Sequence, residues 1–443
     1  NTYGLSRDHT LTNYIFPKGG IYMKKLLVSL LILVLATTFV FAQGGKEATT
    51  AKEGPIELRF WSLFTGGDGE FFDAMIKEFN ASQDEIVMVN DMVKFDNYYT
   101  KLTTALAAKN APDVIVCHQG NLLNYVPSGS LLALDSYVSS SMLADFQQAP
   151  LDACRFDGKL YSLPFDVHPI VMYYNKDILA SAGIDKLPTT AEEFTAASLQ
   201  IKNKTGKWGM AIDNTTGTYK AYTLTRLFMS MMAQQGGSLL SSDNTKANFN
   251  NAEGVKALAW LTDLVNKDQV NPNELDYDAA MNVFKLGDAA FYFNGVWATG
   301  TLEQVNGLNF AAAPLPAFMG QSACWSGSHT LAIPVQKNQD PKKVEAGIKF
   351  IDWMTSHGEM WAKAGHIPTR KSVASKDEMK ALPYRADYAA AAAFALETPR
   401  TPAWEEIYGT MSDMLEKAVT HNLDPKTSLA EMEVAINNII KTY

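Results

Sequence analysis

The chain is poor in cysteine and has no recognisable metal motif, and each shortage excludes a class of protein. Its three cysteines, Cys117, Cys154 and Cys324, are odd in number and widely spaced, so they form neither a disulfide framework nor a zinc site. We expect them to be buried as small apolar side chains. No pair of histidines has an HxxxH or HxH spacing. The sequence therefore predicts no metal and no other cofactor.

Positive charge is also scarce, with 38 Lys and Arg against 47 Asp and Glu and a net charge of −9. Without a basic cluster, the chain is not expected to bind nucleic acid or an anionic membrane surface, and polyanionic ligands are disfavoured. The glycine-rich loop at 65–68 lacks the Lys-Ser/Thr ending of a nucleotide phosphate loop. The 443 residues, 47% hydrophobic and 11% aromatic, can bury a large core, and this length favours two or more lobes.

One long apolar run begins after Met23. Lys24 and Lys25 precede the apolar stretch 26–35, and the segment ends at Ala42, which is the pattern of a secretory signal peptide cleaved near that residue. A membrane anchor is the alternative. No cysteine follows for lipid attachment, so we expect an exported protein that is not lipid-anchored. Residues 1–22 precede the signal and are interpreted as translated leader, and 43–54 as a linker. Cleavage would remove four basic residues and one acidic residue and change the net charge to −12.

From residue 55, strand patterns alternate with helix patterns, which predicts an α/β fold. Strands are expected at 56–60, 86–89 and 112–117, with helices between them at about 71–79 and 98–108. Further along, the patterns predict helices at 222–233, 254–265, 279–286 and 343–354, strands at 208–212, 289–293 and 331–334, and a mostly helical tail at 403–440.

The segment 158–194 carries the most specific pattern. It reads as two strands, 159–165 and 169–174, with a polar break between them, followed by a short helix and by Pro-Thr-Thr before an acidic helix start. Three further segments follow the same family pattern in order: PDVIVCHQGNLLNYVPSGSLLALD at 112–135, FKLGDAAFYFNGVW at 284–297, and the segment 325–370, which runs from WSGSHTLAIP to WAKAGHIPTR. Over about 55–440 the chain resembles the extracellular solute-binding proteins, in particular the sugar-binding family that serves ATP-driven importers.

The resemblance implies a two-lobe periplasmic binding protein fold of type II, each lobe a mixed sheet flanked by helices. The first lobe would comprise 55–166 and 329–367, and the second 168–325 and 371–443. Hinge segments would lie near 165–169, 325–329 and 367–371. Such a protein is no enzyme. It is a monomer in the periplasm that binds a carbohydrate, expected to be neutral, and delivers it to an inner-membrane permease driven by a cytoplasmic ATPase.

Sugar binding needs flat aromatic faces and planar polar groups. Four of the eight tryptophans lie at strand ends or beside Gly or Pro, in segments that the family places around the cleft: Trp61, Trp297, Trp325 and Trp404. Core packing is the competing explanation for each. The polar candidates are Thr65, Asp68, His118, Gln119, Asp166, Ser326, Gly327 and Arg370. Among these, Asp68 could instead cap a helix, Asp166 could stabilise the hinge, and Arg370 could pair with a buried carboxylate.

Three alternatives stay open at this point. The same fold could bind a polyol or a small phosphorylated or acidic compound, with Arg370 holding the anion. An exported glycoside hydrolase would need a carboxylate pair, for which Asp68, Asp166 and Glu405 are the candidates. A surface adhesin would not respond to small sugars.

Overall fold

The computed structural model describes residues 54–396 and 398–443. The leader, signal peptide and cleavage-site predictions lie outside these residues, as does nearly all of the predicted linker. No helix in the described part of the chain is long and apolar enough to cross a membrane.

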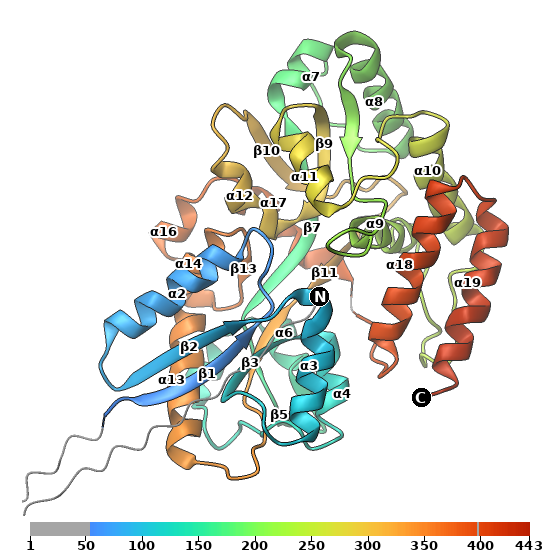
Figure 1. Ribbon diagram of the computed structural model, residues 1–443. Helices are drawn as coiled ribbons and strands as arrows, with labels where there is room; N and C mark the ends of the chain where they lie inside the picture. The colour runs from blue at the N-terminus through green and yellow to red at the C-terminus, as the bar shows by residue number, and fades with distance from the viewer. Residues whose placement is uncertain (1–53, 397) are drawn as a thin grey trace, which may run out of the picture. The chain divides into compact units, whose positions relative to one another are not determined.

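The first of two main sheets has five strands in the order β2-β1-β3-β12-β6. Its strands are β1 (Ile56–Ser62), β2 (Ile86–Met92), β3 (Val114–His118), β6 (Leu163–Pro164) and β12 (His329–Ala332). β1 pairs in parallel with β2 and β3, while β12 runs antiparallel to β3 and β6. Helices α2 (Gly69–Ser82), α3 (Phe95–Ala107) and α13 (Pro341–Ser356) accompany this sheet, and their buried apolar side chains belong to the same core as its strands (Figure 1).

The second sheet has seven strands built around β7 (Asp166–Asn175), in the order β14-β11-β7-β9-β8 with two further strands on β7. These strands are β8 (Trp208–Ala211), β9 (Ala289–Gly295), β10 (Phe310–Pro314), β11 (Cys324–Gly327), β13 (Ile367–Pro368) and β14 (Ala395–Leu396). β7 and β9 are almost wholly buried. Long apolar strands at the centre of a sheet covered on both faces account for this burial.

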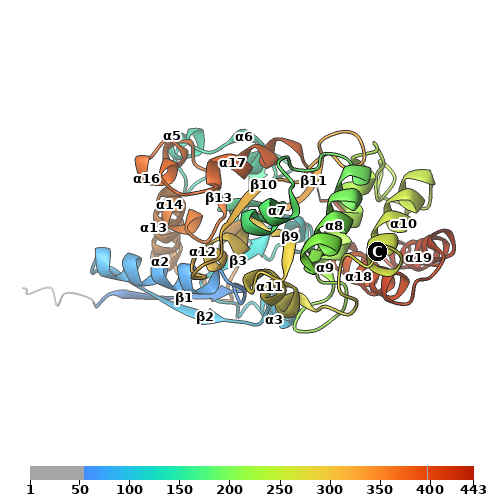
Figure 2. The same cartoon turned by 90° about the horizontal axis from the view of Figure 1, so that it is seen from above.

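Four helices pack together beside this second sheet, as Figure 2 shows. They are α9 (Tyr222–Ala233), α10 (Ala252–Asn266), α18 (Trp404–Thr420) and α19 (Pro425–Ile440). The predicted helical tail is therefore two helices, divided where Asp424 caps α19 and Pro425 starts it. Their apolar faces join the second sheet's largest core cluster.

The remaining helices and strands of the described chain complete the two lobes. They are η1 (Gln119–Asn121), α4 (Leu122–Tyr125), α5 (Ser140–Ala144), α6 (Gln148–Asp152), β4 (Arg155–Phe156), β5 (Lys159–Leu160), α7 (Lys176–Ala182), α8 (Ala191–Thr205), α11 (Tyr277–Lys285), η2 (Val296–Ala298), α12 (Thr299–Glu303), α14 (Gly358–Ala362), α15 (Lys371–Ala374), α16 (Asp377–Lys380), α17 (Arg385–Ala389) and η3 (Ala390–Phe394).

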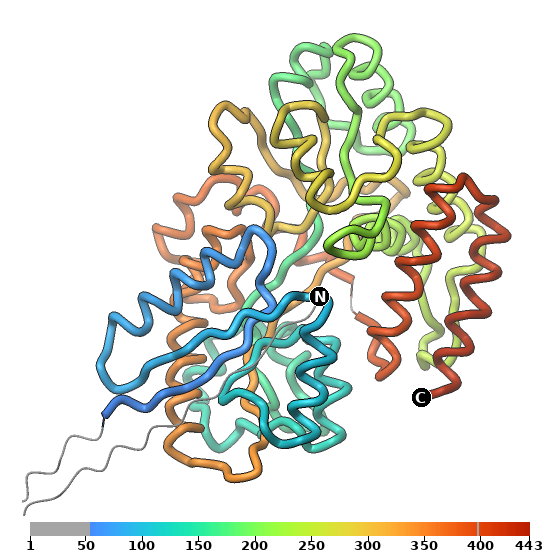
Figure 3. Tube along the Cα trace, in the orientation of Figure 1, coloured from blue at the N-terminus to red at the C-terminus, as the bar shows by residue number. Residues whose placement is uncertain are grey.

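Two of the chain's passages between the two sheets are each a single residue long, and the tube in Figure 3 follows both of them. Residue 165 separates β6 in the first sheet from β7 in the second, and Ser328 separates β11 in the second from β12 in the first. These short links coincide with two of the predicted hinge segments. The lobe boundaries and the hinge motion stay predictions.

Several predicted elements are confirmed, and two are wrong. The acidic helix α8 starts with Thr190 capping the Glu193 amide at 3.2 Å, while the Glu193 carboxylate accepts the Thr189 amide at 2.8 Å. The expected strand at 159–165 is instead two short strands in different sheets, β5 and β6. There is also no polar break before 169, because β7 begins at Asp166 and continues through it. All three cysteines are free and buried, as predicted.

Candidate functional site

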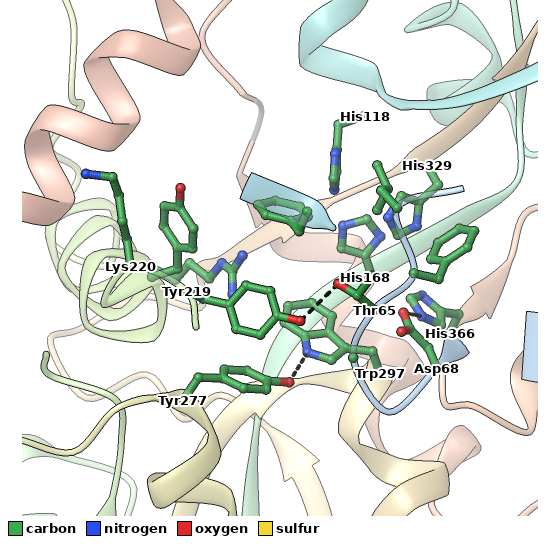
Figure 4. Close-up of a pocket in the computed structure, with 16 residues that line it drawn as sticks. Thr65, Asp68, His118, His168, Tyr219, Lys220, Tyr277, Trp297, His329 and His366 are labelled. Atoms are coloured by element: carbon green, nitrogen blue, oxygen red, sulfur yellow. Dashed lines mark hydrogen bonds and ion pairs between the residues drawn. The ribbon is translucent and has the colours of Figure 1, made fainter. Parts of the chain in front are cut away.

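The larger of two neighbouring cavities contains about 610 Å³ of space free of atoms, including its open mouth. Side chains from both sheets' elements line it: Leu63, Phe64, Thr65, Gly66, Asp68, Phe95, His118, His168, Tyr219, Lys220, Tyr222, Arg226, Tyr277, Trp297, His329 and His366 (Figure 4). Its size is typical of a small-molecule site. Of the predicted ligand contacts, Thr65, Asp68, His118 and Trp297 lie here.

The loop between β1 and α2 forms one wall. Thr65 Oγ1 lies 3.0 Å from the hydroxyl of Tyr219, which comes from the second lobe's loop before α9. Asp68 precedes α2 but makes no capping hydrogen bond with its side chain. Its carboxylate instead lies 3.3 Å from Nε2 of His366, so the alternative of a side-chain helix cap is not the arrangement found, and Asp68 lines the cavity.

Aromatic rings line much of the cavity. Phe95, Tyr219, Tyr222 and Trp297 line the cavity and are half-buried, so part of each ring remains open. The Trp297 indole N–H donates to the Tyr277 hydroxyl at 3.0 Å, which fixes the orientation of the ring. Flat apolar faces held at fixed angles suit the C–H face of a pyranose.

Behind the cavity, one fully buried carboxylate collects the polar groups of four elements. Asp166 Oδ1 lies 2.8 Å from Nδ1 of His168, and Oδ2 lies 2.7 Å from Nδ1 of His329 and 3.1 Å from Nδ1 of His366. Trp361 Nε1 donates to Oδ2 at 2.7 Å, and the His329 amide donates to Oδ1 at 3.0 Å. Because these groups come from β7, β12, α14 and the loop before β13, Asp166 ties the passages between the sheets together.

The charges in this cluster follow from burial and from Asp166. Burial alone would raise the pKa of Asp166, but His329, His366 and His168 outweigh it and hold that pKa well below its usual range. Burial alone would lower the pKa of His366, yet Asp166 and Asp68 raise it to about 9. Burial and the neighbouring His329 lower the pKa of His168 to about 3. At neutral pH the cluster thus holds an imidazolium at 366 and a neutral imidazole at 168.

The same four residues are the candidate metal ligands among the described residues. Asp166, His168, His329 and His366 each offer one ligand atom, and these atoms lie within 4.8 Å of one another. Spacing in the sequence could not reveal this set, because β7, β12 and the loop before β13, far apart in the sequence, contribute to it. Each histidine directs Nδ1 at the Asp166 carboxylate, within 3.1 Å. The absence of a metal stays a prediction.

A second cavity adjoins the first, sharing Phe95, His118, Tyr222 and Arg226 with it. Five of the predicted contacts line this cavity: His118, Gln119, Trp325, Gly327 and Trp404. Glu405 also lines it, and burial raises the pKa of this carboxyl to about 7. Gly327 is required by space, since a Cβ there would come within 2.0 Å of His168 Nε2.

Four predicted contacts line neither cavity: Trp61, Asp166, Ser326 and Arg370. Trp61 is buried under Lys101, whose Nζ lies 4.0 Å from the ring centroid. Arg370 is buried too, bonded to Asp352 and to Thr355 Oγ1 at 2.8 Å, and lies 3.6 Å from Asp145. Pairing with carboxylates is therefore the arrangement that Arg370 has, rather than an open anion site. Whether the predicted residues contact a ligand stays a prediction.

Sequence reasoning missed Arg226 and most of the aromatic wall. Arg226 lies inside an otherwise apolar helix, α9, where a charged residue among Met and Leu was a signal that could have marked it. Tyr219 and Tyr222 lie at the end of the loop 214–222, which none of the four family segments covers. Phe95 begins α3 and had no pattern that separated it from a core residue.

The fold and the cavity between its sheets define a class, the two-lobe periplasmic binding proteins of type II. Residues 74–388 match the bacterial extracellular solute-binding proteins, and the chain belongs to this family. An arabinooligosaccharide-binding protein of Bacillus subtilis (strain 168) is 28% identical over 389 residues, which cover 83% of this chain and 85% of that protein. A maltotriose-binding protein of Pyrococcus abyssi (strain GE5 / Orsay) is 21% identical, covering 89% and 82%.

Solved structures of the same fold are also similar. An ABC transporter solute-binding protein of Thermotoga lettingae TMO, bound with α-D-tagatose, has a TM-score of 0.76 at 25% identity and covers 87% of this chain and 100% of that chain. The GacH receptor of Streptomyces glaucescens GLA.O has a TM-score of 0.77 at 20% identity, covering 88% and 99%, which shows the shared fold.

Proposed function

We propose that this protein is the sugar receptor of an ATP-binding-cassette importer. It binds a mono- or oligosaccharide in the two adjoining cavities and delivers it to an inner-membrane permease driven by a cytoplasmic ATPase. The observation that carries this proposal is the larger cavity, where half-buried aromatic rings line the same space as polar side chains. The sugar-binding relatives support it.

Ligand binding would favour the closed arrangement of the lobes, with the two short links as hinges. The Thr65 and Tyr219 hydroxyl oxygens already lie 3.0 Å apart across the cavity. Closure of the lobes would therefore bring few further side chains into contact with the ligand on that side. We place the protein outside the cytoplasmic membrane, as a monomer.

A binding role fits the carboxylates better than hydrolysis does. A glycosidase needs two carboxyl groups on either side of one sugar bond. Asp68 lines the first cavity and Glu405 the second, while Asp166 lines neither and is saturated by N–H donors. None of the three candidate pairs shares one cavity.

The test is a titration of the purified protein with a panel of mono- and oligosaccharides, following tryptophan fluorescence and the release of reducing ends in the same samples. A receptor shows saturable one-to-one binding of at least one sugar without product formation. Turnover of any sugar would establish an enzyme instead, and a melting temperature that no sugar raises would contradict the receptor.

A further inference from the structure

Arg226 is a buried cation without a buried counter-ion. Its side chain lies on α9, only 9% of the residue is exposed, and it lines both cavities. Among the described residues, no carboxylate oxygen lies within 4.0 Å of its guanidinium nitrogens, the limit for an ion pair. The Arg226 Nε has no hydrogen-bond partner. Buried polar groups are nearly always bonded, and a buried charge without a partner is rarer still.

Aromatic rings pack against the guanidinium of Arg226, which lines both cavities. Its carbon lies 4.3 Å from the ring centroid of Trp325, 5.0 Å from that of Trp297 and 5.5 Å from that of Tyr222. Ring faces attract the cation but accept no strong hydrogen bond. The rings therefore orient the fork of donors without using it.

The groups facing Arg226 do not neutralise it. Tyr408 is uncharged, since burial raises the pKa of its hydroxyl to about 12, and the Arg226 charge offsets only part of this rise. His118 is uncharged as well, because burial and its histidine neighbours hold its pKa well below the usual range. Asp213 is buried nearby, beyond ion-pair distance, and its carboxylate accepts the Thr223 amide at 2.9 Å.

The other cations of the larger cavity already have partners. Lys220 is paired with Asp413, and His366 lies between Asp166 and Asp68. Among the described residues, Arg226 is thus the lining cation that has no carboxylate within ion-pair distance, since Asp68 and Glu405, which also line the cavities, lie farther away, in a chain that is acidic as a whole.

We propose that the ligand supplies this charge and that the receptor takes a carboxylate-bearing sugar, a uronic acid alone or in a short oligouronide, with its carboxylate on Arg226. A planar guanidinium binds a planar carboxylate through two parallel hydrogen bonds. A phosphate dianion would need a second free cation and would be repelled by Asp68 in the same cavity. The sugar ring then lies against Trp297 and Tyr222, next to the bound carboxylate.

This inference rests on the proposed function and differs from the expectation of a neutral sugar that overall charge suggested. It also moves the anion site from Arg370, whose charge is matched by Asp145 and Asp352, to Arg226.

The test is isothermal titration of the full protein with matched ligands: galacturonate against galactose, glucuronate against glucose, digalacturonate against its dimethyl ester, and galactose 6-phosphate. The expected result is at least tenfold tighter binding of an acid than of its neutral partner. Arg226→Gln is expected to abolish the difference, and Arg226→Lys to restore part of it. Arg59→Gln, which removes an exposed arginine paired with Asp91, is expected to leave it unchanged.

If Arg226→Gln does not fold, the comparison of acid and ester on the unaltered protein decides alone. Equal or tighter binding of the neutral sugar or the ester overturns the uronic acid assignment and leaves the sugar receptor intact. Tighter binding of the sugar phosphate overturns the carboxylate assignment in the same way. Failure of every saccharide, charged or neutral, would instead contradict the proposed function itself.

Discussion

Replacing Asp166 by asparagine should destabilise the protein more than any conservative change on its surface. The carboxylate is hydrogen-bonded to two imidazoles, an indole and a backbone amide, it forms an ion pair with the imidazole of His366, and it is fully buried. An asparagine offers one oxygen and turns an NH₂ group toward these donors. It also leaves the His366 imidazolium with Asp68 as its one carboxylate partner, at 3.3 Å.

The magnitude follows from the kind of interaction that the substitution removes. A hydrogen bond to a charged group contributes about 1.5–3 kcal/mol, and breaking a buried ion pair by removing one partner costs about 3–5 kcal/mol. Because His366 can lose its proton, part of this cost is relieved, and we expect a net decrease of about 3–5 kcal/mol in the free energy of unfolding at pH 7.

The assay is urea unfolding followed by tryptophan fluorescence, with Asp91→Asn as the control. Asp91 pairs with Arg59 in an exposed salt bridge, and its loss should change stability by at most about 1 kcal/mol. The His366 pKa, followed by NMR, should fall in Asp166→Asn, since Asp166 is the strongest influence raising it. A decrease in stability no larger than that of the control would refute the view that Asp166 holds the passages between the sheets together.

The remaining predictions concern the cavity wall, the close contact at Gly327 and the histidine charges. Trp297→Ala should weaken sugar binding about fivefold or more in calorimetry, because an aromatic face of this size contributes about 1–3 kcal/mol; unchanged affinity would mean that the ring is only structural. Gly327→Ala places a Cβ 2.0 Å from His168 Nε2 and should reduce stability by about 1–3 kcal/mol in thermal melts, whereas an unaltered melting temperature would contradict this contact. The His366 pKa is raised to about 9 in the folded protein, so the stability that its charge contributes is complete below pH 6.5 and is lost as pH rises through 9. The His168 pKa is lowered to about 3, so the folded protein loses stability as pH falls below 6.5. Unfolding free energies measured from about pH 5 to 9 should therefore peak near pH 6.5, and His366→Gln should flatten the alkaline side but not the acid side.

The fold was predictable from the sequence because its signals are local. Alternating strands and amphipathic helices, the Thr190 cap and the glycine stop after α7 each act over a few residues. The errors lie where pairing partners are distant. β7 starts at Asp166 because that residue pairs with Pro368, some two hundred positions away, and no local pattern encodes that contact.

The site was predictable only in part, because its residues also come from segments that are distant in the sequence. Eight of the twelve predicted ligand residues line a cavity, and Thr65, His118 and Trp297 among them lie at or just beyond the ends of strands β1, β3 and β9. The histidine cluster joins β7, β12 and the loop before β13, and no spacing in the sequence revealed it. Arg226 and Arg370 are alike in sequence terms, and only the positions of Asp145 and Asp352 show which of the two is already paired.

The cavity between Trp297 and the 65–68 loop is where we propose that the sugar binds. A crystal structure of the protein with the tightest-binding saccharide is the decisive experiment. We predict ligand density against Trp297, with an oxygen of the sugar bonded to Arg226 and another to Thr65 or Asp68. A sugar found outside both cavities, with these side chains untouched, would contradict this binding site.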